Sequence, residues 1–285
     1  MRMKFFSIYF FLLVCNCVNS AHVVKLISPK DIQQTQLKIE KTGRIVAGNH
    51  AIVLEFPYQV SIRAVNGSNG SFCGGSIISS RYVLTAAHCT KGFKSFELGF
   101  GSSLLERPLT TMTSRDSIEH PQFESVSLRN DIALIKLPLL VRYTKKISPI
   151  QLPKRSQVSE SYINQKAVVS GFGRFSDESA QLSKSLSFAD LRVIGNRECA
   201  GIFSSKIVTN NVLCARSFSD SNENACMGDS GGPLAMKDED GILTQIGIVS
   251  FVSSRGCLYG DPSGYTRVGK YLDWISEITG IPLRK

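Results

Sequence analysis

Three short stretches of this 285-residue sequence contain side chains that can perform chemistry together. They are Leu84-Thr85-Ala86-Ala87-His88-Cys89, Asn130-Asp131-Ile132-Ala133-Leu134 and Cys226-Met227-Gly228-Asp229-Ser230-Gly231-Gly232-Pro233. A serine hydroxyl is a poor nucleophile at neutral pH and needs a base within hydrogen-bonding reach. Histidine titrates near neutrality and can take that proton, and a buried carboxylate fixes the histidine tautomer. His88, Asp131 and Ser230 are therefore the residue types that nucleophilic acyl transfer requires.

Each stretch has a simpler explanation when it is taken alone. Asp, Ser and Gly are common turn residues, and a lone histidine after an apolar run is usually structural or at the surface. A catalytic role is favoured over these simpler explanations because all three stretches occur in one chain, in this order, among short apolar runs and cysteines. Glycines beside Ser230 also allow backbone N–H groups to point at the oxyanion that acyl transfer creates.

The order His, Asp, Ser along the chain resembles the trypsin and chymotrypsin family of serine proteases, and it differs from the order in subtilisins and α/β-hydrolases. The resemblance covers essentially all of residues 45–285. It includes Ile45-Val46-Ala47-Gly48, Phe56-Pro57-Tyr58-Gln59-Val60-Ser61, Cys73-Gly74-Gly75-Ser76 and Gly264-Tyr265-Thr266-Arg267-Val268. It implies a serine endopeptidase that hydrolyses protein or peptide substrates through an acyl-enzyme.

The resemblance also implies a role for each residue of the site. His88 is expected to be the general base, Asp131 its orienting carboxylate and Ser230 the nucleophile. The N–H groups of Gly228 and Ser230 are expected to form the oxyanion hole, and Ser250 is expected to lie behind the triad near Asp131. A catalytically silent homologue that serves as a binding or regulatory module is the alternative; the intact triad and Gly228 favour an active enzyme.

The elements that must position these residues are short and apolar. β-Branched runs separated by Gly, Asn, Ser and Pro predict an all-β protein. The expected strands include Tyr58–Ile62, Ser76–Ile78, Tyr82–Thr85, Ile132–Leu137, Ala167–Ser170 and Gln245–Phe251. The family resemblance implies two packed six-stranded antiparallel β-barrels. One clear helix is predicted at the C-terminus, where Tyr271, Leu272, Trp274, Ile275 and Ile278 recur at helical spacing before Gly280 and Pro282.

The first twenty residues have the pattern of a secretory signal peptide. Arg2 and Lys4 precede an apolar run from Phe5 to Val14, and small or polar residues follow up to a predicted cleavage after Ser20. A membrane anchor is the alternative, but the apolar run is too short to span a bilayer comfortably. We therefore expect a secreted, extracellular protein that does not associate with membranes.

Six cysteines remain after removal of the signal peptide. An even number in a secreted chain indicates three disulfides, with fifteen possible pairings. A zinc site is the alternative, but no CxxC pair or Cys/His cluster has metal-binding spacing. The family resemblance implies the pairs Cys73–Cys89, Cys199–Cys214 and Cys226–Cys257.

Residues 21–44 are polar and rich in lysine and end at Arg44, just before Ile45. We interpret this segment as an activation propeptide and residues 45–285 as the peptidase domain. By resemblance to the family, cleavage after Arg44 would free the amine of Ile45, which would then pair with the carboxylate of Asp229. A buried carboxylate without a partner is costly, which gives the new cation a reason to enter.

The predicted substrate pocket differs from that of trypsins. Trypsins carry an aspartate at the pocket base, where this chain has Asn224, and a neutral amide stabilises a buried Lys or Arg poorly. Phe251 replaces a usual tryptophan, and Val252 and Ser263 replace usual glycines, so the pocket is expected to be narrow. These residues predict cleavage after uncharged aliphatic or aromatic residues. The pocket set is Asn224, Ala225, Met227, Ser250, Phe251, Val252 and Ser263.

A pocket of this kind disfavours the Arg44 site, so the precursor is expected to need a separate trypsin-like protease for its activation. Protein inhibitors and a monomeric state are further expectations from the family. The net charge of +10 is not concentrated in a basic run, which argues against a nucleic-acid partner.

Two further expectations concern metals and glycans. Calcium-binding relatives place several carboxylates in one loop, whereas the matching stretch here, Gly99–Met112, has only Glu106. We therefore expect no metal and no cofactor. The segment Ala64–Ser71 is expected to be a hairpin loop, and it contains two glycosylation sequons, at Asn66 and Asn69. Glycosylation and a purely structural turn are equally compatible with that segment.

Overall fold

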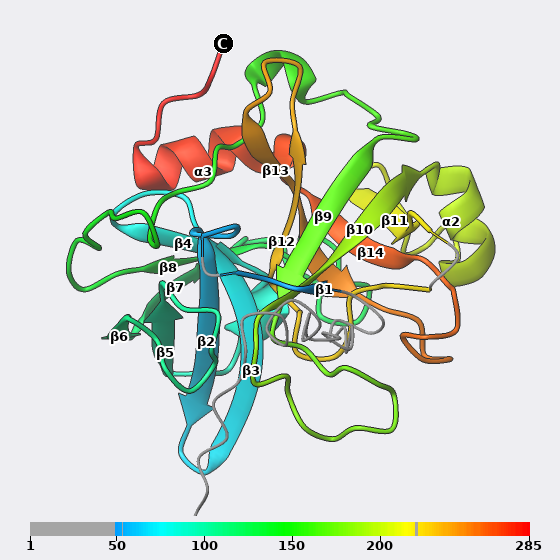
Figure 1. The fold of residues 1–285 in the computed structure, drawn as a ribbon. Helices are drawn as coiled ribbons and strands as arrows, with labels where there is room; N and C mark the ends of the chain where they lie inside the picture. Colours follow the sequence, from blue (N-terminus) through cyan, green and yellow to red (C-terminus); the bar gives the residue numbers. More distant parts are fainter. Residues whose placement is uncertain (1–48, 53, 220–221) are drawn as a thin grey trace, which may run out of the picture. The chain divides into compact units, whose positions relative to one another are not determined.

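The structure is a computed structural model that describes residues 49–52, 54–219 and 222–285. Its strands form two antiparallel sheets, one from β2 to β8 (residues 59–136) and the other from β9 to β14 (residues 166–267) together with the N-terminal β1 (Asn49–His50) (Figure 1). The expected all-β class is confirmed. The predicted signal peptide, the propeptide and the Arg44-Ile45 site lie outside the described residues.

The first sheet has the strand order β6-β5-β2-β3-β4-β8-β7. Its strands are β2 (Gln59–Asn66), β3 (Asn69–Ile77), β4 (Tyr82–Thr85), β5 (Ser95–Phe100), β6 (Thr110–Ser114), β7 (Asp116–Glu119) and β8 (Ala133–Lys136). The edge strands β6 and β7 are separated by Arg115 alone, so the two edges of the sheet adjoin along the chain. If β6 and β7 are taken as two parts of one interrupted strand, this sheet corresponds to the expected barrel of six strands.

The second sheet closes on itself, because β9 and β10 pair directly with each other. Its strands are β1 (Asn49–His50), β9 (Lys166–Gly171), β10 (Ser187–Ile194), β11 (Val212–Ser217), β12 (Pro233–Lys237), β13 (Leu243–Phe251) and β14 (Ser263–Arg267). Six of these form the ring β9-β10-β11-β14-β13-β12, and β1 is added at the side of β10. This part matches the expected six-stranded barrel.

Two buried pairs of polar side chains join the sheets. Ser76 Oγ on β3 donates to Gln245 Oε1 on β13 at 2.6 Å. Ser170 Oγ on β9 donates to Gln59 Oε1 on β2 at 2.7 Å. Buried polar groups are tolerated when they are paired in this way, so these contacts fix one sheet against the other without an unsatisfied group.

The expected C-terminal helix is α3 (Leu272–Thr279), preceded by the short 3-10 helix η3 (Val268–Tyr271). Gly280 ends it in the left-handed conformation with a φ of 70°, which glycine adopts without steric cost. The helix follows the second sheet in sequence but packs on the first, beside β4 (Figure 1). Tyr82 Oη on β4 donates to Ile278 O at 3.4 Å.

A second helix, α2 (Asn196–Phe203), was not predicted from the sequence. Cys199 is its one buried residue, so the helix lacks the apolar stripe that identifies most surface helices. Two more 3-10 turns are η1 (Ala87–Cys89) and η2 (Arg155–Gln157). No helix among the described residues is long and apolar enough to cross a membrane.

The hairpin around Ala64–Ser71 is tighter than expected. β2 and β3 pair up to Asn66 and Asn69, which leaves a turn of Gly67 and Ser68 between them. Gly67 has a φ of 63°, the left-handed conformation that such short turns require. Most of the expected loop is therefore strand, because Ala64–Asn66 pair with Asn69–Ser71.

Candidate active site

His88 lies at the end of β4, within η1, where the adjacent Cys89 is tied to Cys73 on β3. Its Nδ1 is 2.7 Å from Oδ2 of Asp131, and its backbone N–H donates to Oδ1 of the same carboxylate at 2.9 Å. Two contacts to one carboxylate fix both the main chain and the ring of His88. The side chain of His88 is 26% exposed, whereas that of Asp131 is fully buried.

Asp131 is fully buried just before β8. Ser250 Oγ on β13 donates to Asp131 Oδ2 at 2.6 Å, and Thr266 Oγ1 on β14 donates to the backbone carbonyl of Asp131 at 2.7 Å. Two hydroxyls from the second sheet thus hold Asp131, Ser250 through its carboxylate and Thr266 through its backbone carbonyl. The structure brings Ser250 to the place that the family resemblance implied, whereas the part played by Thr266 was not predicted.

Ser230 lies in a tight turn between Cys226 and β12, closed by the N–H of Asp229 donating to Cys226 O at 2.9 Å. The carbonyl of Ser230 accepts the N–H of Gly74 at 2.8 Å. A β-carbon on Gly231 would lie 2.2 Å from Oγ1 of Thr85, so the turn rests on the end of β4 that leads to His88. The hydroxyl of Ser230 makes no hydrogen bond with the described residues; such contacts are often loose before substrate binds.

The N–H groups of Gly228 and Ser230 have no acceptor among the described residues. Gly228 has a φ of 99°, a conformation that favours glycine. Two unpaired N–H groups next to a serine hydroxyl are suited to stabilise a negative oxygen during acyl transfer.

Asp229 is a fully buried carboxylate. Its Oδ1 accepts the N–H of Gly173 at 2.8 Å and its Oδ2 the N–H of Cys226 at 2.9 Å. Burial raises its pKa to about 6, against the opposing effect of the two N–H donors. No ion pair within the described residues involves Asp229, and the predicted partner, Ile45, lies outside them.

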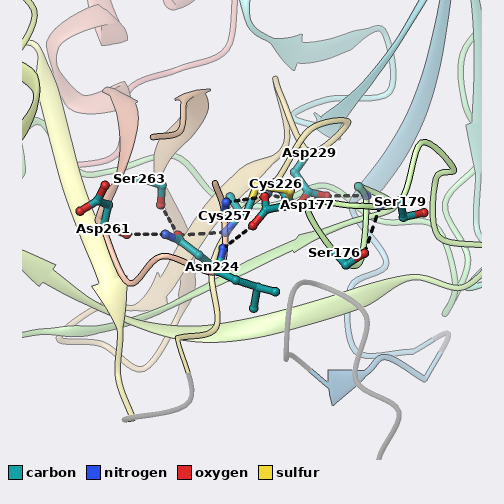
Figure 2. The surroundings of a disulfide bond; sticks show 12 residues. Ser176, Asp177, Ser179, Asn224, Cys226, Asp229, Cys257, Asp261 and Ser263 are labelled. Atoms are coloured by element: carbon teal, nitrogen blue, oxygen red, sulfur yellow. Dashed lines mark hydrogen bonds between the residues drawn. A yellow bond between two sulfur atoms is a disulfide. The ribbon is translucent and has the colours of Figure 1, made fainter. Parts of the chain in front are cut away.

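Asn224 forms a neutral hydrogen-bonded network at the base of the predicted pocket (Figure 2). Its Nδ2 donates to Asp261 O at 2.7 Å, and its Oδ1 accepts from Ser263 Oγ at 2.6 Å and from the N–H of Ala225 at 2.9 Å. Ser263 Oγ also lies 2.6 Å from Tyr265 Oη. Asn224 and Ser263, two positions at which this chain differs from trypsins, are therefore hydrogen-bonded to each other.

The predicted pocket walls are apolar. Val252 packs against the Cys226–Cys257 disulfide. The ring of Phe251 packs so closely on Gly264 that a β-carbon there would lie 2.1 Å from it, and it makes an edge contact with Phe203 on α2. Met227, also predicted for the pocket, is exposed.

A cavity of about 590 Å³ adjoins this wall. It is lined by residues 126–128, by α2 and its flank at 201–203 and 207, and by residues 251–255. Val126, Leu128, Ile202 and Phe203 give it an apolar character, and Arg255 is the one charged side chain of its lining.

The three disulfides of the structure are Cys73–Cys89, Cys199–Cys214 and Cys226–Cys257, the pairs that the family resemblance implied. In the part of the chain that the structure describes, two groups of side chains lie close enough together to hold a metal ion, but each includes a disulfide pair. A disulfide sulfur is not the thiolate that binds zinc. The carboxylate of Glu106 pairs with Arg63 at 2.9 Å.

The family model described as Trypsin matches residues 45–275. This chain belongs to the trypsin family. It is 35% identical over 242 residues to a collagenase of Hypoderma lineatum, covering 85% of this chain and 89% of that protein. It is 34% identical over 243 residues to a chymotrypsin of Phaedon cochleariae, covering 84% of each. The solved structure of HL collagenase is 36% identical, with a TM-score of 0.75 over 83% of this chain and 99% of that one.

The family and these relatives establish the general activity. The chain is a serine endopeptidase, a hydrolase that acts on protein substrates. The all-β arrangement of two sheets is also that of its structural relative.

Proposed function

We propose that this trypsin-family enzyme cleaves peptide bonds with His88, Asp131 and Ser230 as its catalytic triad. The observation that carries the proposal is the double contact of Asp131 with His88, through Nδ1 at 2.7 Å and the backbone N–H at 2.9 Å. With Nδ1 held as the donor to a buried carboxylate, Nε2 is the free basic nitrogen of the ring.

The chemistry follows from this assignment. Ser230 Oγ attacks the peptide carbonyl while His88 accepts its proton, and Asp131 stabilises the resulting imidazolium. The N–H groups of Gly228 and Ser230 bind the oxyanion of the tetrahedral intermediate. His88 then returns the proton to the leaving amine, the C–N bond breaks, and water hydrolyses the Ser230 ester by the same steps.

We propose further that the enzyme is made as a secreted precursor, with residues 1–20 as signal peptide and 21–44 as propeptide. Cleavage after Arg44 would supply the Ile45 ammonium to Asp229. The burial of Asp229 without a cationic partner in the described part of the chain supports this switch, because a buried carboxylate gains strongly from a paired charge.

For specificity, we propose an uncharged residue before the scissile bond. The amide of Asn224, which stands where trypsins have an aspartate, is already engaged by Asp261, Ala225 and Ser263. The apolar cavity beside Phe251 and Val252 suits further apolar side chains upstream in the substrate. The relative named chymotrypsin is consistent with this preference.

The activating enzyme would be a separate trypsin-like protease, because a neutral pocket binds Arg44 poorly. Protein inhibitors and a monomeric state complete the proposal, together with glycosylation at Asn66 or Asn69.

The direct test is to express the precursor, cleave it with trypsin, remove the trypsin, and profile a peptide library varied at the residue before the scissile bond. The proposal predicts hydrolysis after aliphatic or aromatic residues only in the cleaved protein, and none in the Ser230→Ala variant. A dominant preference for Arg or Lys would overturn the specificity assignment, and rapid self-cleavage of the pure precursor at Arg44 would overturn the need for a second protease.

A further inference from the structure

The loop between β9 and β10 contacts the proposed oxyanion hole directly. Besides the bond from Gly173 to Asp229, the N–H of Arg174 donates to the carbonyl of Met227 at 2.8 Å. In a trans peptide the C=O and the N–H point in opposite directions. Since the carbonyl of Met227 points to the loop, the N–H of Gly228 in the same peptide points away from it.

The base of this loop also packs against Gly228. A β-carbon on Gly228 would lie 2.5 Å from Cδ2 of Leu182 and 3.1 Å from Cα of Gly173. Arg174 and Leu182 form an antiparallel bridge that closes the loop. The peptide between Met227 and Gly228, which carries one N–H of the proposed oxyanion hole, therefore packs against a closed loop.

The tip of the same loop reaches the wall of the substrate pocket. Asp177 Oδ1 accepts the N–H of Cys257 at 2.6 Å, and its Oδ2 accepts the N–H of Leu258 at 3.1 Å (Figure 2). The N–H of Ser179 donates to both O and Oγ of Ser176, at 3.3 and 3.1 Å, and this turn presents Asp177.

Gly256 supplies a second observation at this contact. Its φ is 117°, and a β-carbon there would lie 2.6 Å from Oδ2 of Asp177. The carboxylate thus occupies the space that any side chain at residue 256 would need. This close approach allows the carboxylate of Asp177 to accept hydrogen bonds from the consecutive N–H groups of Cys257 and Leu258.

We propose that Asp177 is a positioning residue that holds the Cys257 wall of the substrate pocket against the loop that supports the oxyanion-hole peptide. This inference rests on the proposed function. Cys257 in this wall forms a disulfide with Cys226, which is adjacent to Met227. The loop therefore contacts one disulfide-linked unit at two places, at Met227 through Arg174 and at Cys257 through Asp177. Asp177 closes that unit through its carboxylate, whose two hydrogen bonds go to the backbone of Cys257 and Leu258 and not to the triad.

The chemical consequence is selective. Loss of the Asp177 carboxylate frees two N–H groups of the wall, whose orientation then fluctuates. A substrate side chain that fills the pocket depends on that wall, whereas a small side chain or a small reagent at Ser230 does not. The ratio of activities on large and small substrates therefore reports on Asp177, and a general loss of stability leaves that ratio unchanged.

The experiment compares activated Asp177→Ala and Asp177→Asn with Glu178→Ala and Glu178→Gln. Glu178 is the neighbouring exposed carboxylate and makes no hydrogen bond or ion pair within the described residues. Active enzyme is titrated with diisopropyl fluorophosphate. Steady-state constants are then measured on two peptide anilides, one with the best residue of the library profile before the scissile bond and one with alanine there.

For Asp177→Ala we expect the ratio of kcat/KM between the two substrates to fall about tenfold, mainly through KM, because two bonds to a charged acceptor are lost. Asp177→Asn keeps one acceptor oxygen and should lie between this variant and the wild type; it supplies the measurement if the alanine variant is not recovered. Both Glu178 variants should match the wild type.

An unchanged ratio in the Asp177 variants, with or without a lower melting temperature, would overturn the inference and leave the proposed function standing. An equal fall in the Glu178 variants would also overturn it, because loop charge alone would then explain the effect. Failure of the wild-type enzyme to react with diisopropyl fluorophosphate would instead contradict the proposed function itself.

Discussion

Ser250 Oγ donates a 2.6 Å hydrogen bond to Asp131 Oδ2, the oxygen that also contacts Nδ1 of His88 at 2.7 Å. The serine lies on β13 of the second sheet and the aspartate precedes β8 of the first. One carboxylate is therefore oriented by residues from both sheets, and the position of His88 depends on how the sheets are joined.

This relationship predicts the effect of Ser250→Ala. A hydrogen bond to a charged acceptor contributes about 1.5–3 kcal/mol, so kcat should fall roughly tenfold to hundredfold if the orientation of Asp131 matters in the transition state. Steady-state kinetics on a peptide anilide measure the change. Ser117→Ala, which removes a hydroxyl bonded to Glu119 on β7, is the matched control. A kcat equal to that of the wild type would show that Ser250 does not hold the carboxylate.

Asp229 predicts how the stability of the precursor depends on pH. Burial raises its pKa from 3.8 to about 6, so the folded chain keeps a proton that the unfolded chain releases between these values. The free energy of unfolding should therefore fall as pH rises from about 4 to 6, by up to about 3 kcal/mol from this group. Urea unfolding of a Ser230→Ala precursor at pH 4, 5, 6 and 7 measures the slope.

The double variant Ser230→Ala/Asp229→Asn is the control, because an amide does not titrate and its unfolding should lack this contribution. In the cleaved protein, pairing with the Ile45 ammonium would lower the pKa of Asp229 and reverse the sign of the effect. A precursor whose pH dependence equals that of the double variant would contradict the unpaired state of Asp229.

Val252 predicts a change of specificity. Its side chain packs on the Cys226–Cys257 disulfide at the proposed pocket wall. Val252→Gly should raise kcat/KM for phenylalanine or tyrosine substrates relative to alanine by about tenfold, the size expected for removing a few methyl groups from a pocket. Val252→Ala should give a smaller gain. No change of the ratio in either variant would mean that Val252 does not limit the pocket.

The two sequons predict unequal glycosylation. Nδ2 of Asn66 donates to Gly92 O at 2.7 Å and the residue is half-buried, whereas Asn69 is exposed and its amide makes no hydrogen bond within the described residues. Asn69 should therefore carry the glycan in a protein secreted from eukaryotic cells. Intact-mass measurement of Asn69→Gln and Asn66→Gln tests this; a glycan lost only with Asn66→Gln would contradict it.

Much of the site could be predicted from local sequence. His88, Asp131 and Ser230 each lie in a short motif whose order along the chain is informative, and the apolar runs around them mark most of the strands. The C-terminal helix was predictable because its apolar spacing and Gly280 both agree with the structure.

The contacts that were missed depend on residues far apart in sequence. Asp177 and Cys257 are eighty positions apart, and an acidic residue in a loop has no pattern that reveals its acceptor role. Helix α2 escaped prediction because it buries Cys199 alone. Thr266 and Leu182 act through packing between strands and loops, which only the folded chain specifies.

The central claim, that Ser230 is the nucleophile activated by His88, is tested most directly by covalent labelling. The trypsin-activated protein is treated with a fluorophosphonate, digested, and analysed by mass spectrometry, with Ser230→Ala, His88→Ala and the uncleaved precursor alongside. We predict one adduct on Ser230 in the activated protein, none in Ser230→Ala, and a labelling rate at least about a hundredfold lower in His88→Ala. An activated protein without an adduct on Ser230, or with equal labelling after loss of His88, would contradict the mechanism.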